Sequence, residues 1–319
     1  MATEFDLIQR YFSRPTPTAV LGGGDDCALL QPTPGMQLAV STDTLVVDTH
    51  FFADTDPEKL GWKCLAVNLS DLAAMGATPR WATLALTLPD ADADWLAAFA
   101  DGLYCCADEY GIALVGGDTT RGPLSIGLTV IGEVPPGQAL RRDGAQPGDA
   151  IWVSGTLGDA ALALAALQGR VNLNDADLAQ LAARLHTPSP RVALGLALRG
   201  VAHSAIDISD GLLADLGHIL QRSKVGAVVD YACLPLGEIV HDFTAHPAFD
   251  GCVLAGGDDY ELCFTAPVEA HDVILAISQQ LNLRLSQIGT ICAEPGLTLR
   301  GAQGEALAIP ETGYDHFAA

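Results

Sequence analysis

Basic residues are scarce in this chain. Its 319 residues include 16 lysines and arginines against 39 aspartates and glutamates, which gives a formal net charge of −23. A surface with that charge repels nucleic acids and anionic membranes, and no local Lys/Arg cluster offsets it. The composition therefore excludes nucleic-acid binding and membrane-surface binding. A phosphate ligand has to enter together with divalent cations.

The common sequence motifs of phosphoryl transfer are also missing. No GxxxxGK[ST] loop occurs, and the protein-kinase set of glycine loop, strand lysine, HRD and DFG is absent. Neither HExxH nor CxxC is present, so zinc has no obvious site. Any phosphoryl transfer must therefore use aspartate-held metal ions, one or two arginines and backbone N–H groups.

The eight cysteines include no CxxC pair, and most of them lie in apolar runs. This pattern favours reduced, buried thiols over a disulfide framework. No apolar run approaches the length of a membrane span, and the first six residues show no secretory signal. We therefore expect a cytoplasmic protein with no membrane partner.

Length and composition predict two domains. A chain of 319 residues, 49% of them apolar, exceeds what one hydrophobic core usually supports. Turn-forming residues cluster between Pro135 and Gly148, where we expect the boundary. The prediction is an N-terminal domain of residues 1–137 and a C-terminal domain of residues 138–319. Strands and helices mix in both halves without strict βαβ order, which favours the α+β class.

Hydrophobic periodicity and capping residues predict the individual elements. In the first half we expect strands at 37–43, 81–88, 112–115 and 125–134, and helices at 56–74 and 92–110. In the second half we expect strands at 150–154, 204–208, 260–266, 284–291 and 297–300, and helices at 157–167, 175–185, 190–202, 211–222 and 268–281.

Acidic residues recur beside glycines and at the ends of apolar segments. The six segments are 22–26 (GGGDD), 41–43 (STD), 68–71 (NLSD), 116–120 (GGDTT), 207–211 (DISDG) and 256–259 (GGDD). Carboxylate and hydroxyl oxygens are the ligands that Mg²⁺ prefers, usually with phosphate oxygens completing the shell. Each segment alone also reads as a plain turn or cap. Six together favour metal-dependent phosphate chemistry.

Two of these segments follow expected strands. Residues 116–120 come after the apolar strand at 112–115, in the position where ligand-binding loops of sheet proteins gather, although a plain turn explains them equally well. Residues 207–211 put Asp207 and Ser209 on one side of an extended segment. They then open a helix whose N-terminus suits an anion, with a plain N-cap as the alternative.

Asp71 is unusual because it lies on an otherwise apolar helix face, which it shares with Asn68. A charge in such a place needs a partner. The partner is either a metal ion or a salt bridge to Lys63 or Arg80.

Two other positions have both a functional and a structural interpretation. His50 follows the first acidic strand, but a lone histidine is more often structural than catalytic. The pair Arg141-Arg142 is the densest basic spot in the chain. It either clamps a triphosphate or lies in a solvated turn.

Taken in order, these motifs resemble the bacterial thiamine-monophosphate kinases. The resemblance spans essentially the whole chain and implies a fold shared with aminoimidazole ribonucleotide synthetase and selenophosphate synthetase. In that fold the N-terminal sheets of two copies form a dimeric barrel, so a homodimer is expected. The matching segments are 24–28 (GDDCA), 41–43 (STD), 63–77 (KCLAVNLSDLAAMGA), 116–120 (GGDTT), 207–212 (DISDGL) and 257–262 (GDDYEL), with Glu4-Phe5 at one end and Tyr314-Asp315-His316-Phe317 at the other.

The resemblance also implies an activity and a set of site residues. ATP would phosphorylate thiamine monophosphate to thiamine diphosphate with several Mg²⁺ ions. The implied metal ligands are Asp26, Ser41, Thr42, Asp43, Asp71, Asp118, Asp207 and Asp210. The implied ATP contacts are Gly117, Asp118, Arg142 and Ser209, and the implied thiamine contacts are His50, Asp258 and Tyr314. The catalytic role is assigned to Asp43, Asp118 and Arg142. Position 258 departs from the family's usual Glu with a shorter Asp.

The chemistry of this reaction agrees with the residues present. An acceptor phosphate oxygen is already ionised at pH 7, so direct in-line transfer needs alignment and charge neutralisation but no catalytic base. Two other classes stay open. One is a synthetase of the same fold that couples ATP hydrolysis to a non-phosphate product, and the other is a sensor that binds Mg-ATP without turnover.

Overall fold

The computed structural model describes residues 3–309. The described chain divides into two compact units. The first contains residues 3–72 and 77–137, and the second contains residues 73–76 and 138–309.

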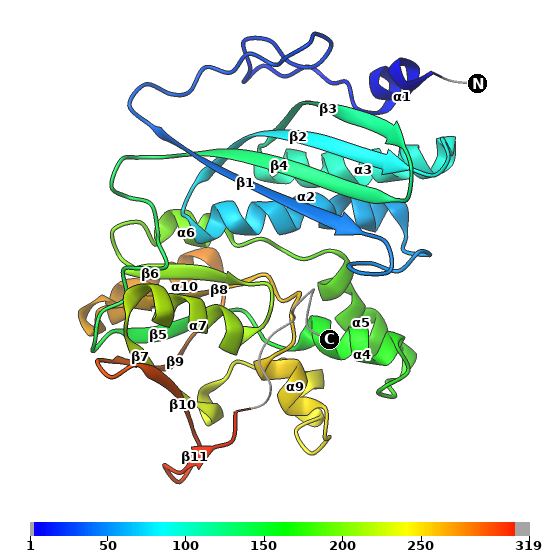
Figure 1. Ribbon diagram of the computed structural model, residues 1–319. Helices are drawn as coiled ribbons and strands as arrows, with labels where there is room; N and C mark the ends of the chain where they lie inside the picture. The colour runs from blue at the N-terminus through cyan, green and yellow to red at the C-terminus, as the bar shows by residue number, and fades with distance from the viewer. Residues whose placement is uncertain (1–2, 310–319) are drawn as a thin grey trace. The chain divides into compact units, whose positions relative to one another are not determined.

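The first unit is built on a four-stranded sheet with the order β1-β4-β2-β3 (Figure 1). β4 runs antiparallel to β1 and β2, whereas β2 and β3 are parallel and are joined by α3. The elements are α1 (Glu4–Tyr11), β1 (Gln37–Val46), α2 (Pro57–Ala74), β2 (Thr78–Leu88), α3 (Ala93–Tyr110), β3 (Ala113–Arg121) and β4 (Ser125–Val134).

The two long helices of this unit begin and end where the sequence predicts. Asp56 accepts a hydrogen bond from the Glu58 N–H at 2.9 Å, and Pro57 is the first residue of α2. Asp92 caps α3, which ends where Gly111 adopts the left-handed conformation. These capping residues confirm the predicted helices.

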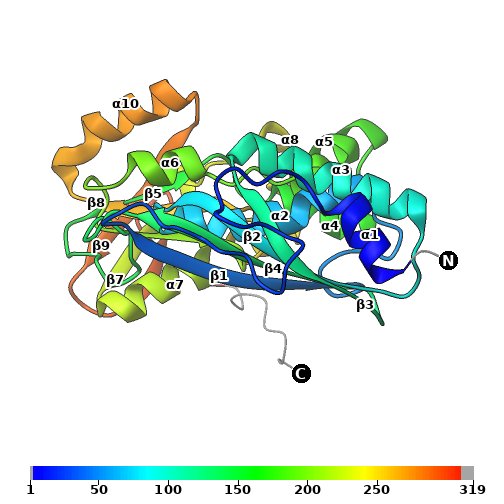
Figure 2. The ribbon, with the colours of Figure 1, turned by 90° about the horizontal axis from the view of Figure 1, so that it is seen from above.

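The four-stranded sheet has one covered and one open face. α2 and α3 lie on the same side of it (Figure 2), and residues of β4 such as Ile126, Leu128 and Val130 are fully buried against that side. Side chains of a strand alternate between faces. On the other face Leu38 and Val40 of β1 remain 46% and 62% exposed.

The second unit contains a seven-stranded sheet with the order β11-β10-β7-β9-β5-β8-β6, in which only the β10–β7 pair is parallel. α7 and α10 lie on opposite sides of it (Figure 2). Its strands are β5 (Ala150–Ser154), β6 (Ser204–Ile208), β7 (Gly226–Asp230), β8 (Glu261–Ala266), β9 (Leu285–Cys292), β10 (Gly296–Arg300) and β11 (Ala306–Leu307). Its helices are α4 (Asp159–Leu167), α5 (Asp175–His186), α6 (Val192–Ala197), α7 (Leu212–Ser223), α8 (Glu238–Asp242), α9 (Phe249–Leu254) and α10 (His271–Leu281).

Two predicted strand ends are wrong. β1 continues to Val46, so residues 41–43 lie inside the strand and not at its tip. β3 continues to Arg121, because residues 116–121 each pair in parallel with a residue of β2. The segment 116–120 is therefore part of an edge strand and not a loop after a strand.

Candidate functional site

The first group of polar residues lies where β1 meets α2. The Ser41 hydroxyl donates a short hydrogen bond to the carboxylate of Asp71, and the Asp43 N–H donates to the Asn68 amide oxygen at 3.1 Å. Ser41 and Asp43 are two residues apart on a strand, so their side chains lie on the same face of the sheet. Thr42 points to the open face, where its hydroxyl lies 2.8 Å from the Thr129 hydroxyl.

The partner of Asp71 was left open by the sequence. The structure gives it the Ser41 hydroxyl. Arg80, one of the two cationic candidates, forms its ion pair with Glu133 at 3.4 Å. Asn68 and Asp71 share a helix face as predicted, and that face contacts the polar part of β1.

The second group lines a cavity of about 440 Å³ at the β3 edge. Asp26 and Asp118 contribute carboxylates to its wall, and Gly117 contributes backbone. Phe12 and Leu114 are among its apolar lining residues. The cavity therefore combines apolar lining residues with three exposed carboxylates, those of Asp25, Asp26 and Asp118, which suits a ligand with an apolar part and a cation-bound phosphate.

Arg14 adds a cation to the lining of this cavity, and no pattern in the sequence predicts it there. Its guanidinium lies 3.6 Å from the centre of the Tyr104 ring and 3.4 Å from the carboxylate of Asp108. Burial raises the pKa of the Tyr104 hydroxyl to about 12, although the Arg14 charge opposes that shift. Only the folded chain brings these residues together, since about ninety positions separate them.

One copy of the chain does not bring Asp43 and Asp118 together. They lie on β1 and β3, the two edges of the sheet, which three strand spacings place about 14 Å apart. They also face opposite sides. Asp118 precedes Thr119, which is buried against the helices opposite Leu86, so Asp118 lies on the open face. Asp43 lies on the helix face.

The third group belongs to the second unit, at the end of β6. The N–H groups of Ser209 and Asp210 donate to one carboxylate oxygen of Asp215 at 3.1 and 3.0 Å. The Asp258 N–H donates to the Ser209 carbonyl at 3.0 Å. Asp207 is buried and is the residue before the last one of β6. Ser209, Asp210 and Asp258 therefore lie in two segments that are hydrogen-bonded together.

Asp215 was not predicted as part of this group. It is 3% exposed, and burial raises the pKa of its carboxyl to about 7, although the Asp210 N–H opposes the shift. Its two backbone contacts fix the turn that holds Ser209 and Asp210. The only signal in the sequence is an acid in the first turn of α7, which is also ordinary helix chemistry.

The other predicted site residues are placed as follows. His50 accepts a hydrogen bond from the Val46 N–H through Nδ1 at 3.0 Å. Arg141 pairs with Asp143 at 2.6 Å, while the exposed Arg142 accepts a hydrogen bond at its carbonyl from the Ser223 hydroxyl. Tyr314 lies outside the described residues.

No three His, Cys, Asp or Glu side chains of residues 3–309 converge on a point where a metal ion could bind. The donors of the first two groups are nonetheless hard oxygen ligands: carboxylates and serine or threonine hydroxyls. That donor set fits Mg²⁺ with phosphate oxygens in the remaining positions, and it does not fit a soft metal.

Comparisons with known proteins cover nearly the whole chain. Residues 24–134 match the AIR synthase related protein N-terminal domain, and residues 146–302 match its C-terminal domain. A thiamine-monophosphate kinase of Escherichia coli (strain K12) is 48% identical over 319 residues, covering 99% of this chain and 98% of the relative. The chain belongs to the thiamine-monophosphate kinase family.

Solved structures of the thiamine-monophosphate kinase family agree with this assignment. The crystal structure of the enzyme from Stenotrophomonas maltophilia K279a has a TM-score of 0.85 and 53% identity, covering 91% of this chain and 93% of that chain. AaThiL complexed with AMPPCP and TMP has a TM-score of 0.77 and 29% identity, covering 98% and 96%. The predicted resemblance and the α+β fold of two domains are both confirmed.

The two domain matches divide the acidic groups. Asp26, Asp43 and Asp118 fall in the first match, whereas Ser209 and Asp258 fall in the second. Within residues 3–309, no helix has both the length and the apolar character required to cross a bilayer.

Proposed function

We propose that this protein transfers the γ-phosphoryl group of ATP to thiamine monophosphate and releases ADP and thiamine diphosphate. The observation that carries the proposal is the 48% identity to a curated thiamine-monophosphate kinase over 99% of the chain. A structural neighbour across 98% of the chain was solved with AMPPCP, an ATP analogue, and with TMP.

The reaction is proposed to be a direct in-line transfer. The attacking group is a phosphate oxygen of thiamine monophosphate, which is ionised at neutral pH, so the protein has to align two anions and offset their charge. Bound Mg²⁺ supplies the positive charge that screens the two phosphate groups. Exposed carboxylates, hydroxyls and arginines of this chain are suited to holding that arrangement.

The proposed residue roles are those that the family resemblance implies. The proposed metal ligands are Asp26 and Asp118 of the cavity, Ser41, Asp43 and Asp71 of the β1–α2 junction, Thr42 on the open face of β1, and Asp207 and Asp210 at the end of β6. Gly117, Asp118, Arg142 and Ser209 are proposed to contact ATP. His50, Asp258 and Tyr314 are proposed to contact the thiamine substrate, and Asp43, Asp118 and Arg142 are proposed as the catalytic residues.

We also propose that the protein is a homodimer formed through the open face of the first unit's sheet. Val40 and Leu38 leave apolar area on that face, beside the paired hydroxyls of Thr42 and Thr129. An exposed apolar sheet face favours burial against a partner. A second copy is the proposed partner because the open faces of two identical sheets can then pack against each other.

The proposed location is the cytoplasm. All eight cysteines lie within the described residues and are free thiols, four of them buried. A reducing compartment suits such a set.

A coupled assay for ADP tests the proposed function. Purified protein with ATP and Mg²⁺ should release ADP only when thiamine monophosphate is added, with one thiamine diphosphate formed per ADP, and excess EDTA should abolish turnover. ADP release without thiamine monophosphate would favour a synthetase that uses another substrate. Saturable Mg-ATP binding with no ADP release under any of these conditions would favour a sensor.

A further inference from the structure

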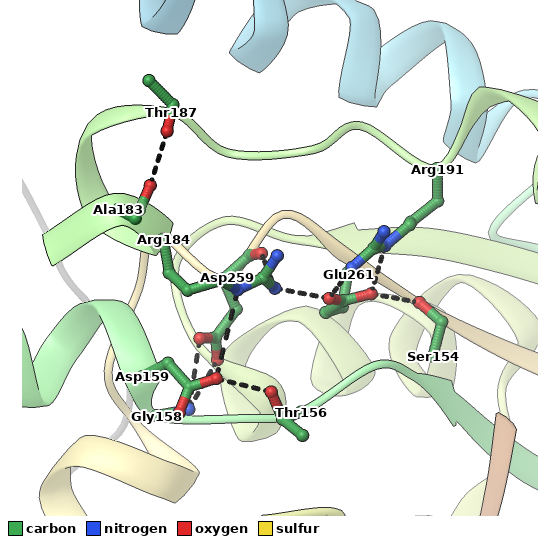
Figure 3. Close-up of polar contacts among 10 residues, drawn as sticks. All are labelled: Ser154, Thr156, Gly158, Asp159, Ala183, Arg184, Thr187, Arg191, Asp259 and Glu261. Carbon is green, nitrogen blue, oxygen red and sulfur yellow. Dashed lines mark hydrogen bonds and ion pairs between the residues drawn. The ribbon is translucent and has the colours of Figure 1, made fainter. Parts of the chain in front are cut away.

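A buried ion-pair network lies in the second unit, directly beside Asp259, the residue that follows Asp258 in the chain (Figure 3). Glu261 is the first residue of β8 and is 0% exposed. Its carboxylate accepts hydrogen bonds from Arg184 at 2.5 Å, from Arg191 at 2.6 Å and from the Ser154 hydroxyl at 2.6 Å. Arg191 adds a second, shorter hydrogen bond and is therefore bidentate.

The network joins parts of the unit that are far apart in sequence. Arg184 comes from α5 and Arg191 immediately precedes α6. Ser154 ends β5 and also accepts a hydrogen bond from the Leu262 N–H at 2.9 Å. A Cβ at Gly155 would lie 2.1 Å from the Glu261 carboxylate, so only glycine leaves room for it. The site is built around this one side chain.

The segment before Glu261 has an uncommon backbone. Asp258 has a φ of +67° and Tyr260 a φ of +48°, both in the left-handed region that non-glycine residues seldom occupy. The Asp258 and Tyr260 N–H groups donate to the Ser209 and Ile208 carbonyls at 3.0 and 2.8 Å. A strained segment keeps such a conformation only when its surroundings hold it in place.

Two contacts connect the network to this segment. Arg184 reaches the Asp259 carbonyl at 3.5 Å while it donates to Glu261. The Asp259 side chain is 3% exposed and accepts from the Gly158 N–H through both oxygens at 3.1 Å. Residues 259 and 261 thus anchor the chain on both sides of Tyr260.

We propose that Glu261, with Arg184 and Arg191, is a positioning device that sets the conformation of residues 256–260 and thereby the affinity for the phosphoryl acceptor. The inference deepens the proposed function, on which the role of Asp258 as a thiamine contact rests. Glu261 does not touch the substrate in this scheme. It acts through the backbone that presents Asp258.

The electrostatics favour this arrangement. Burial raises the pKa of the Asp259 carboxyl well above its ordinary value, although the Gly158 N–H and the Arg184 charge oppose the shift. The Asp159 carboxylate accepts a hydrogen bond from the Thr156 hydroxyl at 2.5 Å, and the same carboxylate lies 4.0 Å from the Arg184 guanidinium. The Arg184 charge is therefore directed chiefly at Glu261. Loss of either Arg184 or Glu261 would leave the charge of the other, which is buried or half-buried, without full compensation.

Steady-state kinetics of Glu261→Gln test the proposal. The change keeps the shape of the side chain but removes its charge. We expect the KM for thiamine monophosphate to rise by roughly tenfold, with the KM for ATP within about twofold of wild type. A merely structural role predicts a lower kcat from a smaller folded fraction and unchanged KM values. That result would overturn the proposal.

A double-mutant cycle sharpens the test. If Glu261 acts through Asp258, Glu261→Gln and Asp258→Ala should be non-additive in the KM for thiamine monophosphate. If the KM increase of the double variant equals the product of the increases of the two single variants, the proposal is contradicted. Asp230→Asn is the matched control, since it breaks the more exposed Asp230–Arg300 pair of the same unit and should leave both KM values unchanged.

Hydrogen exchange gives a readout that does not depend on activity. We expect faster amide exchange in peptides covering 256–262 of Glu261→Gln and unchanged exchange over β10. Arg184→Gln, which keeps the Arg191–Glu261 pair, should show the same change to a smaller degree if Glu261→Gln does not fold. Unchanged exchange at 256–262 refutes the proposal. If the wild-type protein does not turn over thiamine monophosphate, that result refutes the proposed function but not the effect of Glu261 on the conformation of residues 256–260.

Discussion

The acidic side chains of this protein differ in burial and in the hydrogen bonds that they accept from the backbone. Asp215 and Asp259 are each 3% exposed, and their oxygens accept backbone N–H groups. Asp26 and Asp118 are exposed on the wall of the cavity. Buried carboxylates of the first kind organise backbone, whereas exposed ones remain able to bind a cation.

The proposed metal-binding acids give the first prediction. Asp43→Asn and Asp118→Asn each remove a proposed ligand charge and keep the size of the side chain. We expect turnover to fall by about a hundredfold or more at saturating Mg²⁺ in each variant, because the lost charge stabilises the transition state. The midpoint of thermal unfolding should change little, since each substitution keeps the size of the side chain.

Asp90→Asn is the control for that pair. Asp90 is exposed, and its carboxylate lies 3.6 Å from the exposed guanidinium of Arg121, so its loss should leave turnover unchanged. Near-normal turnover of Asp43→Asn or Asp118→Asn would remove that residue from the site.

Residue types and spacing predicted part of the candidate site. The shared helix face of Asn68 and Asp71 followed from a spacing of three residues, and the structure places both against β1. The Ser41 partner of Asp71 was not predicted, because thirty residues separate the two. Arg14 and Asp215 were missed for the same reason: their contacts depend on tertiary structure and not on a local pattern.

At the scale of elements, capped helices were easier to predict than strand ends. Asp92 and Gly111 mark α3 through local hydrogen bonding and a left-handed turn. β3 has no such local signal, since Gly, Asp and Thr from 116 to 120 are more typical of turns. Pairing with β2 overrides that preference and extends the strand to Arg121.

Gly117 shows how closely β3 approaches β2. Its φ is +153°, and a Cβ there would lie 1.9 Å from the Leu84 carbonyl oxygen. Gly117→Ala should therefore destabilise the first unit by about 2–4 kcal/mol through overpacking and backbone strain. Thermal or urea unfolding measures this loss.

The neighbouring glycine is a matched control for that variant. A Cβ at Gly116 would meet no atom within 4 Å, so Gly116→Ala should change the unfolding free energy by less than about 1 kcal/mol. Equal unfolding free energies of the two variants would show that Gly117 lies farther from the Leu84 carbonyl than in this structure.

At the scale of the whole molecule, composition and pattern were enough to predict the α+β class but not the strand order. The order β1-β4-β2-β3 depends on pairing between segments that are distant in sequence. The strands β7 and β11 were missed. The two residues of β11 carry no periodicity, whereas β7 is as long as the correctly predicted β5 and β6, so its length alone does not explain the miss. The open sheet face emerges only from this order.

The open face makes the proposed dimer testable. Val40→Glu places a charge on that face and should convert a dimer into a monomer, as measured by light scattering coupled to size-exclusion chromatography. Val273→Glu on α10 is the control, since Val273 is 49% exposed in the second unit and should leave the mass unchanged. A monomeric wild type at micromolar concentration, or a dimeric Val40→Glu, would contradict the proposed interface.

The separation of Asp43 from Asp118 leads to a sharper prediction for that dimer. The two carboxylates lie at opposite edges and on opposite faces of one sheet, so a single metal ion cannot bind both within one copy. If both serve one site, one of them must come from the second copy. Asp43→Asn and Asp118→Asn are each inactive in this scheme. Unfolding and refolding them together should form mixed dimers that have one site with both aspartates and one site with neither.

The recovered turnover should therefore reach about a quarter of the wild-type value, because random pairing makes half of the dimers mixed and half of their sites intact. The same variants refolded separately and then combined in the assay provide the control, and they should stay inactive if subunits exchange slowly. A lack of recovery in dimers whose mixed composition is verified by mass spectrometry would mean that Asp43 and Asp118 serve separate sites, each complete within its own copy of the chain.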